Sequence, residues 1–88
     1  MAGRDLYHGH YCGRGQRGAG LAPTDALDAV CKRHDECYDA AARRSCACDA
    51  ALRREALVVA NTASLSRELR SRAASVAQAA ELMGCEQP

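Results

Sequence analysis

The chain lacks phenylalanine and tryptophan, and its only tyrosines are Tyr7, Tyr11 and Tyr38 among 88 residues. A core without large aromatic side chains must be built from leucine, valine, alanine and cysteine, and so short a chain buries only a small core. Six cysteines offset this shortage. In a short chain they are typical of a disulfide framework formed in an oxidising compartment, and each disulfide stabilises the fold by about 2–4 kcal/mol.

Long apolar runs and strong charge are also missing. No run approaches the roughly 20 apolar residues of a membrane-spanning helix, and a net charge of +1 gives no field that would favour nucleic acid. The start, Met1 to Asp5, carries no hydrophobic signal segment, so we expect a mature, secreted chain behind an added or initiator methionine. All 12 basic residues except Lys32 are arginine, which together with abundant alanine indicates a bacterial source with a GC-rich genome.

Apolar residues recur at helical spacing after a glycine-rich start, so the sequence predicts an all-α fold. We expect a single domain over 1–88. Its expected parts are a loop region and three helices, over 1–23, 24–43, 46–62 and 64–84. Thr24 is the expected N-cap of the first helix, and Gly84 is the expected stop of the third. The apolar stripe of the third helix, from Leu65 to Met83, is expected to pack into the core and not to face lipid.

The short connection between the first two helices requires them to run antiparallel, which narrows the disulfide pairing. Cys37 and Cys48 would then lie at equal depth across the seam, and Cys12 would anchor the glycine-rich loop to Cys31. Cys46 lies too close to Cys48 in sequence to form a disulfide with it easily, so we expect Cys46 to bond to the remaining cysteine, Cys85. The predicted disulfides are Cys12–Cys31, Cys37–Cys48 and Cys46–Cys85.

His34 is the strongest candidate for a catalytic residue, because histidine titrates near neutral pH and acts as a general base. With Cys37 bonded to Cys48, Asp49 would lie beside His34 and Tyr38, where a carboxylate fixes the imidazole tautomer and stabilises its cation. No serine or free cysteine is expected beside His34, so the attacking nucleophile would be water.

Attack of water on an ester requires that the developing oxyanion be stabilised. Calcium suits this role, because it is a hard cation that takes oxygen ligands from carboxylates and backbone carbonyls. Asp35, the neighbour of His34, would supply carboxylate oxygens. The turn Gly13-Arg14-Gly15, tethered by Cys12, would aim carbonyls inward because glycine adopts the dihedral angles required.

Together these segments resemble the secreted phospholipases A2. The resemblance runs from Tyr11 to Asp49, a little under half of the chain. A glycine-rich loop alone is weak evidence, whereas four motifs in a fixed order are specific. The motifs are Tyr11-Cys12-Gly13-x-Gly15, Pro23-x-Asp25-x-Leu27-Asp28, Cys31-x-x-His34-Asp35-x-Cys37-Tyr38 and Cys46-x-Cys48-Asp49.

The resemblance implies calcium-dependent hydrolysis of the sn-2 ester of glycerophospholipids by a secreted monomer that docks transiently on a lipid surface. His34 would be the base, Asp49 its partner, and Tyr38 a hydrogen-bond support for Asp49. The backbone N–H of Gly13 would help to bind the oxyanion. The implied calcium ligands are the carbonyls of Tyr11, Gly13 and Gly15 and the carboxylate of Asp35. Docking is expected to use arginines and aliphatic residues such as Leu6 and Leu21.

Several features depart from the family's usual pattern. Val30 stands where many members carry a second cysteine, and the partner of that cysteine is missing near Glu55, which indicates that one disulfide has been deleted. The β-hairpin between the two long helices is absent, and with it a second tyrosine that supports the aspartate. The segment from Cys12 to Cys31 is longer than in many members. The N-terminal helix that lines the lipid channel is reduced, which leaves the third helix as a candidate wall.

Two alternatives from other classes remain open. A catalytically silent phospholipase-like protein, used for binding or toxicity, would typically lack His34 or Asp35, and both are present. A zinc-stabilised binding module would require free thiolates and would leave Asp35 and Asp49 without a role. Its candidate ligands are His8, His10, Cys12, Cys31, His34, Cys37, Cys46 and Cys48.

Overall fold

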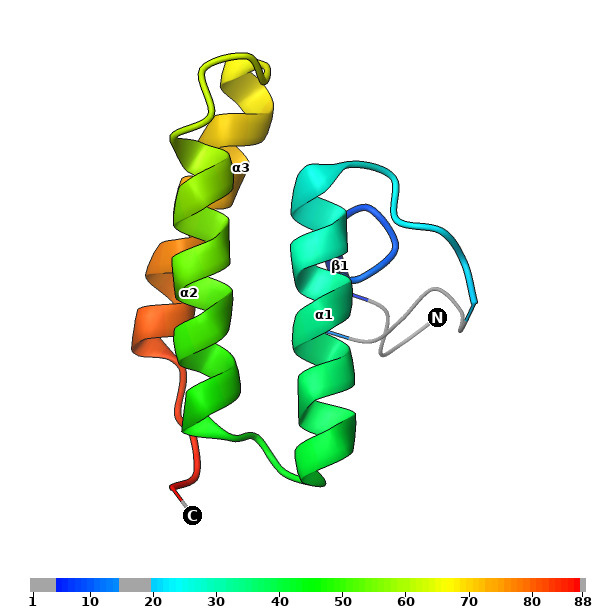
Figure 1. Cartoon of the computed structure of the whole chain (residues 1–88), viewed down its shortest axis with the longest axis vertical. Coiled ribbons are helices and arrows are strands. Elements are labelled where there is room, and N and C mark those ends of the chain that lie inside the picture. Colours follow the sequence, from blue (N-terminus) through cyan, green and yellow to red (C-terminus); the bar gives the residue numbers. More distant parts are fainter. Residues whose placement is uncertain (1–4, 15–19, 88) are drawn as a thin grey trace.

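A computed structural model describes residues 5–14 and 20–87, which form three helices and a small β-hairpin (Figure 1). The elements in chain order are β1 (Asp5–His8), β2 (Cys12–Arg14), α1 (Ala26–Ala41), α2 (Cys46–Ala60) and α3 (Arg67–Leu82). The helical body confirms the predicted all-α class. The antiparallel pairing of β1 with β2 was not predicted, because strands of four and three residues are too short to show an alternating pattern.

The helix ends differ from the predicted caps. Asp25, and not Thr24, is the N-cap of α1, since its side chain accepts the N–H of Asp28. The helix ends at Ala41 because Ala42 adopts the left-handed conformation, with φ of 57°. Met83, in an extended conformation, caps α3, so the helix ends before Gly84. At these ends, side-chain hydrogen bonds and backbone conformation outweigh the residue preferences used for the prediction.

The core lies between the three helices and the hairpin. α2 packs most extensively against α3, and small residues such as Ala56, Ala73 and Ala77 are buried in these helices. Leu27 and Val30 of α1 add the larger apolar side chains. Because alanine side chains are small, the two helices approach closely, and aliphatic residues fill a core that has no phenylalanine or tryptophan.

All three predicted disulfides are present: Cys12–Cys31, Cys37–Cys48 and Cys46–Cys85. They join the hairpin to α1, α1 to α2, and the start of α2 to the C-terminal tail. No cysteine is free. The zinc-module alternative is therefore wrong, because it required free thiolates. Within the described part of the chain, no helix is long and apolar enough to cross a membrane.

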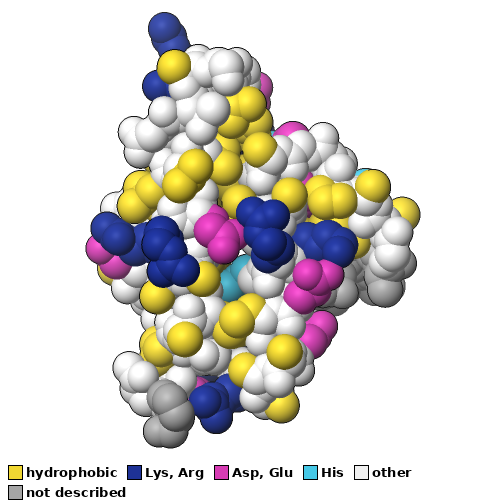
Figure 2. Space-filling model, in the orientation of Figure 1, with side chains coloured by type: hydrophobic (Ala, Val, Ile, Leu, Met, Phe, Trp, Pro, Cys, Tyr) yellow, Lys and Arg dark blue, Asp and Glu magenta, His cyan; other side chains and the backbone are white. Residues whose placement is uncertain are grey.

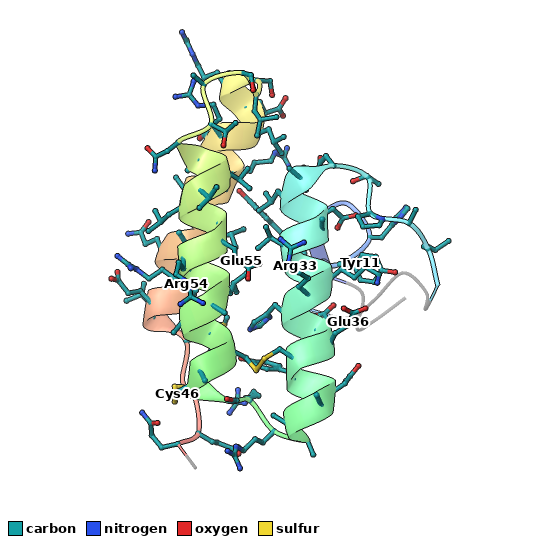
Figure 3. The ribbon with its side chains drawn as sticks, in the orientation of Figure 1. Tyr11, Arg33, Glu36, Cys46, Arg54 and Glu55 are labelled. Atoms are coloured by element: carbon teal, nitrogen blue, oxygen red, sulfur yellow. A yellow bond between two sulfur atoms is a disulfide. The ribbon has the colours of Figure 1, made fainter. Side chains whose placement is uncertain are left out.

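An ion pair joins α1 to α2 near the level where the sequence indicates a deleted disulfide. Arg33 and Glu55 meet across the seam, with Nε and Oε1 2.9 Å apart (Figure 3). Their side chains are 56% and 36% exposed. Such exposed pairs contribute about 0–1 kcal/mol, against about 2–4 kcal/mol for a disulfide. The ion pair is therefore expected to stabilise this seam less than a disulfide at the same level would.

Candidate active site

His34 and Asp49 form a buried pair between α1 and α2. Nε2 of His34 lies 2.8 Å from Oδ1 of Asp49, and the two side chains are only 10% and 5% exposed. A carboxylate accepts hydrogen bonds and does not donate them, so Nε2 carries the proton. The lone pair is then on Nδ1, the ring nitrogen that does not bond to Asp49. This geometry leaves one ring nitrogen able to accept a proton while a carboxylate orients the imidazole, as a general base requires.

Tyr38, one turn after His34, supports the same carboxylate. Its hydroxyl donates a hydrogen bond to Oδ1 of Asp49, and its ring centroid lies 4.2 Å from that of His34. Burial, the hydrogen bond to Asp49 and the charge of Asp49 together raise the pKa of Tyr38. The hydroxyl therefore stays protonated and remains a donor at physiological pH.

The second oxygen of the Asp49 carboxylate is in a different situation from the first. Oδ2 is buried, and among the described residues it has no hydrogen-bond partner. This matches the absence, inferred from sequence, of a second supporting tyrosine. Asp49 therefore depends on Tyr38 and His34, both of which use the other oxygen.

A cavity of about 610 Å³ opens beside this pair. Its lining includes Gly13, His34 and Asp35, together with the apolar residues Leu52 of α2 and Val76 of α3. The volume lies within the range of small-molecule sites, which combine mostly apolar walls with a few placed polar groups. The cavity thus brings His34 together with a surface suited to an apolar ligand.

Asp28 fixes the hairpin turn against α1, a role that the sequence analysis did not predict. Its fully buried carboxylate accepts the backbone N–H groups of His10, Tyr11 and Thr24 at 2.8–3.0 Å, and the Thr24 hydroxyl at 3.2 Å. Burial acts to raise the pKa of Asp28, but these hydrogen bonds outweigh it and the pKa is lowered. The carboxylate is therefore ionised and holds the segment that leads into Gly13.

Two further contacts hold this turn. Gly9 has φ of +59°, and a Cβ on it would lie 2.4 Å from Cγ of Asp28, so only glycine fits there. Nε2 of His8 lies 2.7 Å from Oδ2 of Asp25, the N-cap of α1. His8 and Gly9 therefore both help to hold the hairpin turn against α1, a role that the sequence analysis did not predict.

The structure describes three of the four predicted calcium ligands, and all three lie at the cavity. Tyr11, Gly13 and Asp35 all line it, and Gly13 has φ of +122°, a value typical of glycine. Gly15 lies outside the described residues.

The available donor atoms fit a hard cation. The described residues contain no group of three or more histidine, cysteine or acidic side chains able to hold a metal. An ion beside Asp35 would therefore depend on backbone carbonyls. All cysteine sulfur atoms are in disulfides, so the donors are oxygen atoms, which calcium prefers and zinc does not require.

Charged side chains of both signs form a band across the face of α1 and α2 seen in Figure 2. Several of them are paired: Lys32 with Glu36, Arg33 with Glu55, and Arg53 with Glu81. Because the signs alternate, this face carries no field of one sign that would attract a polyanion.

Comparison with known proteins completes the description of the site. The family model described as phospholipase A2 matches residues 4–86. The chain belongs to the phospholipase A2 family. Members with related sequence include the acidic phospholipase A2 KBf-grIB of Bungarus fasciatus, 58% identical over 31 residues, which are 35% of this chain and 20% of that protein. The basic phospholipase A2 CM-III of Naja mossambica is 46% identical over 39 residues, which are 44% of this chain and 30% of that protein.

These matches are local, since the chain spans less than a third of the length of either phospholipase A2. Both proteins come from snakes and give no support to the bacterial source that the composition suggested. No solved structure matches the chain.

Proposed function

We propose that this protein hydrolyses the sn-2 ester bond of glycerophospholipids and releases a fatty acid and a lysophospholipid. The observation that supports it best is the buried pair of His34 and Asp49 beside a cavity that also contains Asp35 and Gly13. Membership of the phospholipase A2 family gives the reaction class.

In the proposed mechanism, Nδ1 of His34 accepts a proton from water while the water oxygen bonds to the ester carbonyl carbon. Asp49 stabilises the imidazolium that forms, and Tyr38 keeps Asp49 in place. The intermediate then collapses, the bond between the carbonyl carbon and the glycerol oxygen breaks, and the imidazolium returns its proton to that oxygen. His34 ends the cycle neutral, as it began.

Asp35 is proposed to hold calcium together with the backbone carbonyls of Tyr11, Gly13 and Gly15. The ion, when bound, would supply positive charge for the oxyanion that forms on the ester. The backbone N–H of Gly13 is the proposed hydrogen-bond donor to the same oxygen. Asp28, through its hydrogen bond from Tyr11, holds this segment in position before any ion arrives.

The proposed setting is extracellular, at a phospholipid membrane or micelle surface, with the protein acting as a monomer. Three disulfides are compatible with export to an oxidising compartment. The surface around the cavity offers apolar contacts, since Tyr7 and Met83 line the cavity and are 47% and 37% exposed. Leu21 is also exposed, in agreement with its proposed part in docking, whereas the side chain of Leu6 lies outside the described residues.

The test is fatty-acid release from vesicles of phosphatidylcholine or phosphatidylglycerol that carry a label on the sn-2 chain. Each vesicle is assayed with excess calcium and with a chelator, and lipid labelled on the sn-1 chain is the matched control. We expect sn-2 release only with calcium. No release from either lipid would contradict the proposed activity and would favour the catalytically silent alternative.

A further inference from the structure

One face of α3 forms a wall of the cavity that holds His34. Ser75, Val76, Ala79 and Met83 all line the cavity, and their spacing places them on one side of the helix. Figure 1 shows α3 passing behind α2, while β1 lies behind α1. α3 therefore borders the same cavity as the β-hairpin and α1.

The side chains of this wall are small or flexible. Ser75 and Ala79 are exposed, Val76 is half-buried, and Met83 is 37% exposed. The wall contains no aromatic residue, and Leu52 of α2 continues the apolar lining. A wall of this kind leaves room beside it and offers an extended hydrocarbon chain an apolar contact without specific hydrogen bonds.

The end of this wall is held firmly. Cys85, two residues after Met83, is bonded to Cys46 at the start of α2. The carbonyl of Glu86 accepts the N–H of Cys46 at 3.1 Å, and the N–H of Glu86 donates to the carbonyl of Arg44 at 2.8 Å. These links tie the segment that follows α3 to the connection between α1 and α2.

α3 also contributes to the core. Ala73 and Ala80 are buried in the core, and Val76 packs against that core. Val76 and Met83 also line the cavity. The prediction that the stripe from Leu65 to Met83 only packs into the core is therefore incomplete. The same helix presents one set of residues to the core and an adjacent set to the cavity.

We infer that this face of α3 selects the acyl chain of the substrate, and that Ala79 limits the length of chain that fits beside His34. The inference rests on the proposed function, because it assigns the part of the cavity beside His34 to the ester and the apolar wall of α3 to the hydrocarbon. The chemistry of the lining decides the occupant: a hydrocarbon chain gains from burial against valine, alanine and methionine, and a polar chain does not.

The experiment compares Ala79→Phe with Ala74→Phe. Ala74 is an exposed residue of the same helix that does not line the cavity, so both variants carry the same loss of helix propensity. Hydrolysis of dibutyryl-, dihexanoyl- and dioctanoyl-phosphatidylcholine is measured below the micelle concentration, where docking on a surface does not contribute. Ser75→Phe, on the same wall, is the second variant should Ala79→Phe fail to fold.

We expect Ala79→Phe to lower kcat/KM for the dioctanoyl lipid about tenfold relative to the dibutyryl lipid. A hydrophobic pocket that no longer accommodates a methylene group of the substrate lowers kcat/KM by about this factor or more. Ala74→Phe should keep the chain-length profile of the unmodified protein. Equal profiles for all variants would overturn the inference and leave the proposed function standing.

Binding of decylphosphocholine, measured by calorimetry with a chelator present, gives a readout that does not depend on turnover. We expect Ala79→Phe to bind this probe more weakly than Ala74→Phe. If the unmodified protein hydrolyses none of the lipids, the proposed function fails. The binding comparison then still decides whether α3 contacts a hydrocarbon chain, and equal affinities would overturn that assignment.

Discussion

Tyr38 donates its hydroxyl hydrogen to Oδ1 of Asp49, the same oxygen that lies 2.8 Å from Nε2 of His34. The other oxygen, Oδ2, is buried and has no partner within the described residues. The orientation of Asp49 is therefore secured on one oxygen only. No second hydroxyl in the described part of the chain shares this task, so Tyr38 is a sensitive point of the site.

Tyr38→Phe should lower kcat about tenfold and destabilise the fold by about 1–3 kcal/mol, because a buried carboxylate loses a donor that nothing replaces. KM for the lipid should change little, since the hydroxyl contacts Asp49. Lipid turnover and urea unfolding of the disulfide-intact protein measure the two effects. An unchanged kcat would contradict the dependence of Asp49 on Tyr38.

The raised pKa of Tyr38 gives a prediction at alkaline pH. The ordinary value is 10.0, and burial followed by the hydrogen bond and charge of Asp49 raises it in the folded protein. The folded state thus holds this proton to higher pH than the unfolded state. The stabilisation is complete below pH 10 and is lost as pH rises through the folded pKa.

An alkaline pH jump, with phenolate absorbance read before the protein unfolds, tests this shift. The unmodified protein should show an ionisation step for Tyr38 at higher pH than that of free tyrosine. That step should be missing in Tyr38→Phe. Ionisation of all tyrosines at the ordinary value in the unmodified protein would contradict the burial and pairing of Tyr38.

Much of the helical framework follows from the sequence. The period of the apolar residues predicts the helices, and a short connection after Ala41 requires α1 and α2 to run antiparallel, which places Cys37 opposite Cys48. The helix ends depend on individual hydrogen bonds, such as that of Asp25, which the periodicity does not encode. The hairpin depends on contacts with α1 more than on any strand pattern of its own.

The site was predicted only in part. The motif spacing brings together His34, Asp35, Tyr38 and Asp49, and the structure places them around one seam and one cavity. The role of Asp28 was missed, because a carboxylate in the first turn of a helix ordinarily faces solvent and interacts with the helix dipole. Only the three-dimensional path of the turn brings backbone N–H groups to it.

Gly9→Ala should destabilise the protein by about 3 kcal/mol or more, because a left-handed backbone and a clash with Asp28 act together. Gly20→Ala is the matched control: Gly20 has φ of +87° but no atom within 4 Å of a new Cβ. The control should cost only about 1–2 kcal/mol of backbone strain. Equal losses in chemical denaturation would show that the turn does not need its close approach to Asp28.

Asp35→Lys should abolish calcium binding and with it lipid turnover, because it replaces the proposed carboxylate ligand with a cation. Asp39→Lys makes the same charge change at an exposed position on the same helix and should keep both properties. Calorimetric titration with calcium measures binding without any need for turnover. Calcium affinity retained in Asp35→Lys would show that the metal assignment is wrong.

The most direct test of the proposed reaction is a comparison of His34→Ala with the unmodified protein. Both are assayed for sn-2 fatty-acid release in excess calcium, after circular dichroism and calcium titration have shown equal fold and equal metal binding. We predict that His34→Ala binds calcium normally and releases no fatty acid above background, because no other histidine among the described residues lines the cavity. Release at a rate near that of the unmodified protein would contradict the assignment of His34 as the base.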